Sequence, residues 1–333
     1  MPEFRRDPVS GRWAIIAPER GKRPTDFFIP AEKVEKGRCP LCPGNEELTP
    51  PEVLALGRPK EAPPNSPGWR VRVVPNKYPA LLPGKIEKDE GIYERISGSG
   101  VHEVIVETPD HRKPMARYSP RELALVFEAY RLRLIELARD ERWRYVLIFK
   151  NRGARAGASL SHDHSQLVAL PLIPELVKVE LERSRLYHAR YGECLFCRLI
   201  ESEKDGPRKI CENERFLAFM AYAPRQPLET WILPKNHSSD FLEHFGENLE
   251  SLCEIFLTVL GKLEAVLPGL PYNLVLHTAP LREPPLPYYH WHFEVIPHLT
   301  RVAGFEWGTG AHIVPLLPEE AAAFLRDLSP HES

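Results

Sequence analysis

The sequence lacks any long hydrophobic run, because none of its apolar stretches approaches the ~20 residues that a membrane-spanning helix needs. Its opening residues, Met-Pro-Glu-Phe-Arg-Arg, also lack the apolar core of a signal peptide. Neither positive nor negative charge dominates, since the chain has 44 Lys and Arg and 46 Asp and Glu. This balance argues against bulk binding to nucleic acid or to an anionic membrane. We therefore expect a soluble, cytoplasmic protein with no nucleic-acid or membrane partner.

Cysteine is scarce, and its placement is informative. Four of the six cysteines form two Cys-x-x-Cys pairs, Cys39/Cys42 and Cys194/Cys197. In a cytoplasmic chain such pairs indicate a bound metal before they indicate a disulfide. At 333 residues the chain is long enough for two ordinary domains.

The two halves of the chain repeat one order of features. Each half has a Cys-x-x-Cys pair, a strand that runs into a proline and then a histidine, a long helix, a second strand, and a loop leading to a strand with His-x-His. The first long helix is expected over 120–139, opened by the capping box Ser119-Pro-Arg-Glu122. The second is expected over 247–267. A shared order of this length is hard to obtain by chance, so it predicts a tandem duplication of one α+β unit, with a boundary near residue 190.

One glycine-rich stretch lies between two strand-like runs, over 145–149 and 167–173. It reads Asn151-Arg-Gly-Ala-Arg-Ala-Gly-Ala-Ser159-Leu-Ser-His162-Asp-His164-Ser-Gln166. A loop of small residues lets backbone N–H groups approach an anion closely. Because side chains alternate along a strand, the two histidines and the glutamine at its end would project from one face.

Each half also offers four nitrogen and sulfur ligands for a metal. They are Cys39, Cys42, His111 and His162 in the first half, and Cys194, Cys197, His237 and His290 in the second. Four such ligands suit tetrahedral zinc, and a closed shell of four implies a structural role. The alternative is a set of reduced core cysteines and surface histidines. Recurrence of the set in the same order favours two zinc sites.

With His162 assigned to a metal, His164 is left free for chemistry. A neutral imidazole, with an ordinary pKa of roughly 6.5, is a competent nucleophile toward phosphorus at pH 7. Gln166 can donate to a phosphoryl oxygen, and Ser159 with nearby backbone N–H groups can neutralise developing charge. The basic cluster of Arg20 and its neighbours is either solvated surface or a phosphate contact.

These motifs together resemble the galactose-1-phosphate uridylyltransferase family and the related ADP-glucose phosphorylases of the histidine-triad superfamily. The resemblance covers nearly the whole chain. The matching segments are Arg6-Asp-Pro-Val-Ser-Gly-Arg-Trp13, Ala17–Pro24, Cys39-x-x-Cys42-Pro-Gly-Asn45, Pro109-Asp-His111, Asn151–Ser159, His162-x-His164-x-Gln166, Leu233-Pro-Lys-x-His237, His290-x-His292 and Gly304-Phe-Glu306.

The resemblance implies a tandem duplication of a histidine-triad-like unit, in which helices pack on an antiparallel sheet. Residues 1–190 would form the nucleotidyltransferase domain with the catalytic histidine. Residues 191–333 would form the domain with the structural metal and the sugar-contacting segment. It also implies a homodimer, because the segment with Gly304-Phe-Glu306 matches one that reaches the partner's sugar. The implied nucleotide- and phosphate-contacting residues are Arg20, Arg23, Asn76, Asn151, Ser159 and Gln166, and Glu306 is the implied hexose contact.

The implied reaction is a ping-pong transfer in which His164 takes a nucleoside monophosphate from UDP-glucose or ADP-glucose and passes it to hexose 1-phosphate or phosphate. The chain departs from the uridylyltransferase pattern at Asp163, where proline is usual, and at Lys77, Ala158, Ser165 and His312. In that branch the second metal, which could be iron, is often held by a glutamate and three histidines. Here that set could be Glu180, His277, His290 and His292.

The leading hypothesis is therefore a hexose-1-phosphate nucleotidylyltransferase, most simply UDP-glucose–galactose-1-phosphate uridylyltransferase. The intact Cys194/Cys197 pair and the run Gly304–Gly310 are closer to the phosphorylase branch, so ADP-glucose phosphorylase is the first alternative. A non-catalytic, zinc-stapled nucleotide-binding protein is the second.

Overall fold

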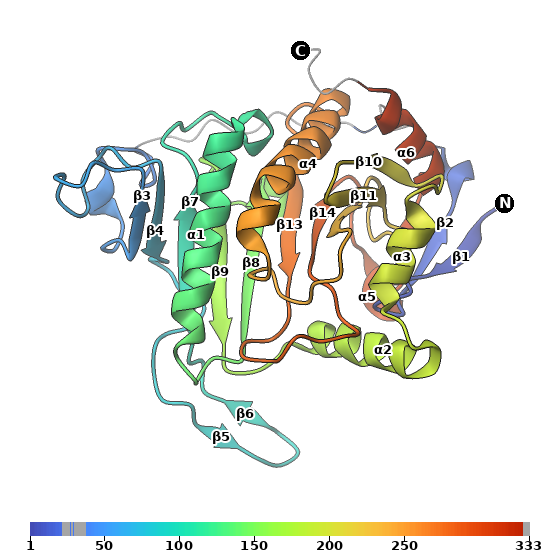
Figure 1. The fold of residues 1–333 in the computed structure, drawn as a ribbon, viewed down its shortest axis with the longest axis horizontal. Helices are drawn as coiled ribbons and strands as arrows, with labels where there is room; N and C mark the ends of the chain where they lie inside the picture. The colour runs from blue at the N-terminus through green and yellow to red at the C-terminus, as the bar shows by residue number, and fades with distance from the viewer. Residues whose placement is uncertain (22–26, 28, 30–37, 329–333) are drawn as a thin grey trace.

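One large sheet organises the molecule (Figure 1). The computed structural model describes residues 1–21, 27, 29 and 38–328. The strands of this sheet are β3 (Leu54–Leu56), β4 (Val71–Pro75), β7 (Val101–Val106), β8 (Tyr145–Arg152), β9 (His164–Leu170), β10 (Lys209–Glu212), β11 (Phe216–Met220), β12 (Thr230–Pro234), β13 (Tyr272–His277) and β14 (His292–Pro297). They lie in the order β10-β11-β12-β14-β13-β8-β9-β7-β4-β3, and each strand is antiparallel to its neighbours.

The strand order confirms the tandem duplication and the α+β fold. Counted from its outer edge, the first half contributes β3-β4-β7-β9-β8 and the second contributes β10-β11-β12-β14-β13. In both halves the last two strands along the chain exchange places in the same way. The halves meet where β8 pairs with β13, so the sheet runs without a break from one half to the other. The proposed division at residue 190 stays a prediction.

The helices are α1 (Pro120–Ala138), α2 (Glu175–Tyr191), α3 (Leu195–Glu203), α4 (Phe245–Val266), α5 (Gly304–Thr309) and α6 (Pro318–Asp327). Two of them, α1 and α4, begin and end close to the ranges predicted for them, 120–139 and 247–267. The Ser119 hydroxyl accepts a hydrogen bond from the backbone N–H of Glu122, whose carboxylate accepts from the backbone N–H of Ser119, which confirms the capping box. Among the described residues, no helix is both long and apolar enough to cross a membrane.

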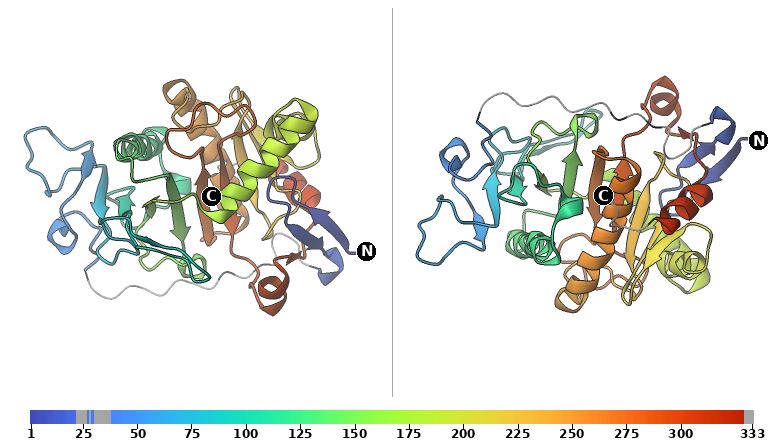
Figure 2. Two further views of the ribbon diagram at one scale, coloured as in Figure 1. Left: turned by 90° about the horizontal axis from the view of Figure 1, so that it is seen from below. Right: turned by 90° about the horizontal axis from the view of Figure 1, so that it is seen from above.

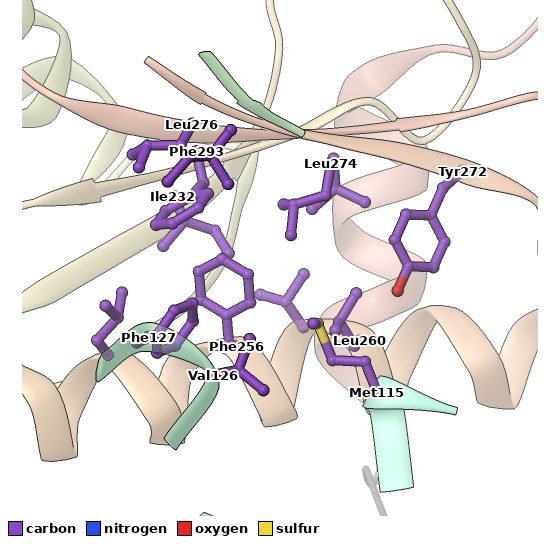
Figure 3. Packing of buried hydrophobic residues seen from close by; sticks show 14 of the residues in the cluster. Met115, Val126, Phe127, Ile232, Phe256, Leu260, Tyr272, Leu274, Leu276 and Phe293 are labelled. Carbon is purple, nitrogen blue, oxygen red and sulfur yellow. The ribbon is translucent and has the colours of Figure 1, made fainter. Parts of the chain in front are cut away.

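The two long helices α1 and α4 cover the same face of the sheet (Figure 2). Between them and the sheet, the rings of Phe127 on α1, Phe256 on α4 and Phe293 on β14 meet with centroid separations of 4.7 to 5.8 Å (Figure 3). All three side chains are fully buried. Burial of each is worth roughly 1.5–3 kcal/mol, so this shared core binds the two halves together.

A smaller sheet joins the two ends of the chain. It consists of β1 (Glu3–Arg6), β2 (Trp13–Ile16) and β15 (His312–Val314), with β15 parallel to β2. Arg5 reinforces the join through an ion pair with Glu319 at 2.9 Å. The first strands of the chain therefore lie beside the second half (Figure 1). A separate hairpin of β5 (Lys88–Asp89) and β6 (Arg95–Ile96) projects from the first half.

Strand alternation decides which side chains face away from α1 and α4. In β9, Leu167 and Ala169 belong to the helix-covered core, and the Ser165 hydroxyl contacts Tyr130 of α1. The intervening residues His164 and Gln166 therefore project from the opposite face. The candidate site lies on that face.

Candidate active site and metal centres

The imidazole of His164 is held in one tautomer by the backbone. Its Nδ1 lies 2.8 Å from the carbonyl oxygen of His162. A carbonyl oxygen only accepts, so Nδ1 carries the proton and Nε2 keeps a lone pair in the neutral ring. Burial lowers the pKa of His164, which keeps the ring neutral at pH 7. Among the described residues Nε2 has no hydrogen-bond partner, so its lone pair is free, as a nucleophilic imidazole would require.

Gln166 is oriented by a histidine that sequence reasoning missed. His102, on β7, accepts the backbone N–H of Ala80 at its Nδ1 over 3.1 Å, so its proton is on Nε2. That Nε2–H donates to Oε1 of Gln166 over 2.9 Å. The Asn76 amide nitrogen lies 3.1 Å from the same Nε2, which brings this predicted residue next to the cluster, but two N–H donors face each other there and do not form a hydrogen bond. With its oxygen engaged, the Gln166 amide offers only N–H donors, as a phosphate contact requires.

Asn151 lies beside His164 across the sheet. Lys150 pairs with Ser165, and Asn151 is the next residue along β8, while His164 precedes Ser165 on antiparallel β9. The two residues thus lie next to each other where the pairing of β8 with β9 ends.

The predicted glycine loop follows directly after β8. It contains the short 3-10 helix η5 (Ala154–Ala156), flanked by Gly153 with φ 80° and Gly157 with φ 91°. These are left-handed backbone conformations that favour glycine. Ser159, at the end of the loop, is exposed and makes no hydrogen bond within the described part of the chain. No contact therefore supports its predicted role, which stays a prediction.

Three further predicted contacts lie elsewhere. Arg20 is exposed at the end of η1 (Pro18–Arg20), and Arg23 lies outside the described residues. Glu306 accepts the backbone N–H of Ala303 over 2.9 Å and so acts as a helix cap on α5. Within the described ranges no hydrogen bond or ion pair joins Arg20 or Glu306 to His164, and their roles stay predictions.

The first predicted metal set comes together as one cluster. Its ligand atoms, from Cys39, Cys42, His111 and His162, all lie within 4.8 Å of one another. Sulfur–nitrogen separations are 3.7 Å from Cys39 to His162, 3.3 Å from Cys42 to His111 and 3.5 Å from Cys42 to His162. Tetrahedral zinc with ordinary bond lengths places such ligand atoms roughly 3.6 Å apart. The residues therefore fit a tetrahedral ion.

Hydrogen bonds behind these histidines point their Nδ1 atoms at the thiols. The Nε2 of His162 donates to the Thr108 carbonyl over 2.8 Å, and the Nε2 of His111 lies 3.2 Å from the Ser161 hydroxyl. Bonds of this kind fix the tautomer and the orientation of a metal ligand.

The second set repeats the same geometry. Cys197 lies 3.4 Å from Nδ1 of His237 and 3.9 Å from Nδ1 of His290, and Cys194 completes a cluster within 4.8 Å. The Nε2 of His290 donates to the Pro234 carbonyl over 2.8 Å, as His162 does to Thr108 in the first half. The second set thus fits a tetrahedral ion in the same way.

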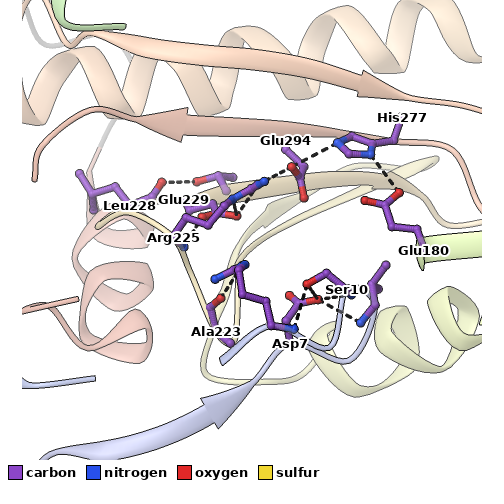
Figure 4. A network of polar contacts seen from close by, with 12 residues as sticks. Asp7, Ser10, Glu180, Ala223, Arg225, Leu228, Glu229, His277 and Glu294 are labelled. Carbon is purple, nitrogen blue, oxygen red and sulfur yellow. Dashed lines mark hydrogen bonds and ion pairs between the residues drawn. The ribbon is translucent and has the colours of Figure 1, made fainter. Parts of the chain in front are cut away.

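A third cluster, of His277, His292 and Glu294, lies at the second half's counterpart of the His164 site, and Figure 4 shows His277 and Glu294. His277 lies between Glu180, at 3.1 Å, and Glu294, at 3.2 Å. Burial opposes a charge on His277, yet the two carboxylates raise its pKa to about 10. His292 stacks on this ring with a centroid separation of 4.5 Å. His292 is fully buried and packs against its neighbours, whereas its counterpart His164 faces the candidate site.

The alternative metal set of Glu180, His277, His290 and His292 is not assembled as one group. His290 turns to the cysteines, whereas His277 and His292 gather with Glu294, which sequence reasoning missed. Spacing along the sequence could not show that Glu294 would replace His290, because the register of β13 and β14 decides it.

Buried charges lie under the turn that carries His164. The Lys150 ammonium contacts Glu107 at 2.7 Å and Asp163 at 3.2 Å, and none of the three side chains is more than 9% exposed. Asp163 also accepts the backbone N–H of Met115 over 2.7 Å. The aspartate that departs from the usual His-Pro-His thus ties the turn to Lys150 on β8 and to the backbone at Met115.

Comparison with known proteins shows the family to which this chain belongs. The sequence profile described as "Galactose-1-phosphate uridyl transferase, N-terminal domain" matches residues 1–174. The chain belongs to the galactose-1-phosphate uridylyltransferase family. It is therefore an enzyme of the nucleotidyltransferase type, which confirms that prediction.

Two branches of relatives are similar over nearly the full length. An ADP-glucose phosphorylase from Arabidopsis thaliana is 36% identical over 98% of this chain and 93% of its own. A galactose-1-phosphate uridylyltransferase from Thermotoga maritima is 31% identical over 98% of each chain. Among solved structures, an Arabidopsis thaliana ADP-glucose phosphorylase with bound ADP-glucose has a TM-score of 0.83 and 34% identity, covering 99% of this chain and 100% of its own. A uridylyltransferase has a TM-score of 0.76 and 29% identity, covering 98% and 97%.

Proposed function

We propose that this family member is a hexose-1-phosphate nucleotidylyltransferase that works by ping-pong transfer through a covalent nucleotidyl-His164. One observation carries the proposal. The His162 carbonyl holds the proton on Nδ1 of His164, and Nε2 keeps its lone pair in a neutral ring. The neighbouring His162 has both nitrogens committed, one to Thr108 and one to the thiols, so it cannot substitute.

In the first half-reaction, Nε2 of His164 attacks the α-phosphorus of a nucleoside diphosphate hexose. A P–N bond forms, the bond to the bridging oxygen breaks, and hexose 1-phosphate leaves with the electron pair. The Nδ1 proton stays on the ring, where the His162 carbonyl stabilises the charge that develops. In the second half-reaction a phosphate oxygen of the acceptor attacks the same phosphorus and releases His164. Gln166 and Asn151 donate to the phosphoryl oxygens during both steps.

Each Cys2His2 cluster is proposed to hold a structural zinc ion. Two thiolates and two imidazoles suit zinc better than iron at a site with no carboxylate. Bound zinc supplies a rigid cross-link with no redox chemistry. In the first half it would fasten the Cys39–Cys42 turn to His162, two residues before the nucleophile.

Two reactions share this first step and differ in base and acceptor. Uridylyl transfer from UDP-glucose to galactose 1-phosphate is the first candidate, supported by the matching family profile and by the Thermotoga maritima relative. Phosphorolysis of ADP-glucose is the second, supported by the higher identity of 36% to the Arabidopsis thaliana phosphorylase and by the intact thiol pair of the second metal cluster. We also propose a homodimer, in which Glu306 reaches the partner's hexose.

The test is to trap the intermediate. The enzyme is incubated with UDP-glucose or ADP-glucose labelled at the α-phosphate, and the protein is assayed for acid-labile, base-stable label. Galactose 1-phosphate or phosphate is then added to discharge it. His164→Ala is expected to abolish labelling while the fold stays intact, and His162→Ala to lose metal and stability. His244→Ala is the matched control, because its ring is 64% exposed and takes no part in either cluster. A His164→Ala enzyme with normal turnover would refute the proposal.

A further inference from the structure

Two residues of the second half contact the glycine loop of the first. Asn273, on β13, pairs directly with Asn151 on β8. Its amide nitrogen lies 2.7 Å from Oδ1 of Asn151 and 2.9 Å from the carbonyl oxygen of Ala156 in η5. His298, just after β14, has its Nε2 2.5 Å from Oδ1 of Asn273. These contacts form a chain that ends at the side chain beside His164.

The chain has only one consistent direction. Two carbonyl oxygens accept from the Asn273 amide nitrogen, which therefore gives one hydrogen to each. Oδ1 of Asn273 must then accept, so Nε2 of His298 carries a hydrogen and donates it. As a result, Oδ1 of Asn151 is engaged, and its Nδ2–H groups remain available to a ligand.

We propose that Asn273 and His298 are positioning residues that hold Asn151 as a hydrogen-bond donor toward the phosphates and anchor the glycine loop. The phosphate role of Asn151 rests on the proposed function. An amide that was free to rotate could present its oxygen, which repels a phosphoryl oxygen. Tethering that oxygen removes the unfavourable orientation before the substrate arrives, which is preorganisation.

The first half uses the same device at Gln166. There His102 donates to the glutamine oxygen, and the amide nitrogen is left as the donor. Both amides that flank His164 thus have their oxygens engaged by hydrogen bonds traceable to a histidine. For Asn151 that histidine is His298, which belongs to the second half of the chain. The second half, in which His292 is buried, would thus contribute to the chemistry of the first half.

Variants of His298 distinguish a role as a hydrogen-bond donor from a role that only fills space. His298→Leu fills similar space without a donor, whereas His298→Gln can still donate to Asn273. We expect His298→Leu and Asn273→Leu to speed hydrogen exchange in residues 153–157 roughly twofold to tenfold. We expect both to lower kcat/KM for the nucleotide sugar roughly tenfold to a hundredfold, with most of the loss in kcat. His298→Gln should stay within about threefold of the wild type in both measurements.

Asn213→Leu is the matched control. Asn213 is also half-buried and also donates across segments, to the Ser251 carbonyl over 2.7 Å, but it lies near the β10 edge of the sheet. It should leave loop exchange and kcat/KM unchanged.

Two results would overturn the inference: wild-type exchange and turnover in His298→Leu, or equal damage in His298→Leu and His298→Gln. If the wild-type enzyme shows no transfer at all, the proposed function fails. Hydrogen exchange then still decides the anchoring, since faster loop exchange in His298→Leu supports it and unchanged exchange refutes it.

Discussion

The buried charges around Lys150 give a prediction about stability. The Lys150 side chain is fully buried and contacts two carboxylates, one fully buried on Glu107 and one 9% exposed on Asp163. Lys150→Met removes the cation and keeps most of the volume, which leaves both carboxylates without their common partner. Breaking a buried ion pair from one side costs about 3–5 kcal/mol, so we expect the free energy of unfolding to fall by that amount at pH 7.

The loss should depend on pH in a defined direction. Burial raises the pKa of Glu107 even though Lys150 opposes the rise, and removal of Lys150 raises it further. The native state then binds a proton at a pH where the unfolded state has released it. Stability of the variant therefore falls as pH rises through this window, by at most about 1.4 kcal/mol per pH unit. The variant should recover part of its stability at pH 5.5 relative to pH 7.5.

Urea denaturation of wild type and variant at the two pH values measures both effects. Lys113→Met is the control, because the Lys113–Glu122 pair is about 30% exposed on both sides and should contribute no more than about 1 kcal/mol. A Lys150→Met protein within about 1 kcal/mol of wild type at pH 7 would show that the carboxylates find other partners, and the reasoning would be wrong.

Two further predictions concern the metals and the nucleophile. Protein purified without added metal should contain two zinc ions per chain by elemental analysis. Cys42→Ser and Cys197→Ser should each lose one zinc ion, and the control Cys211→Ser should lose none. Wild-type protein that contains no zinc would refute both sites. Because burial lowers the pKa of His164 below its ordinary value of 6.5, the acid limb of kcat/KM, on which the ring gains a proton, should have its midpoint below pH 6.5; a midpoint above pH 6.5 would contradict this assignment.

Much of the candidate site could be predicted from residue types and their spacing. Thiols and imidazoles are common metal ligands, so two Cys-x-x-Cys pairs and two His-x-His pairs in one order indicated both metal sets. The same repeat predicted the duplication that the strand order confirms. The capping box placed the start of α1, because capping depends on residues close together in the chain.

Only the tertiary structure decided the partners of each polar side chain. His102, Asn273 and His298 have no motif around them, yet they set which end of an amide faces the site. Glu294 was hidden for the same reason, since it meets His277 only through the pairing of β13 with β14. Ligand identity follows from local chemistry, which the chain carries in its order of residues. Hydrogen-bond direction follows from strand register and burial, which exist only once distant segments have packed together.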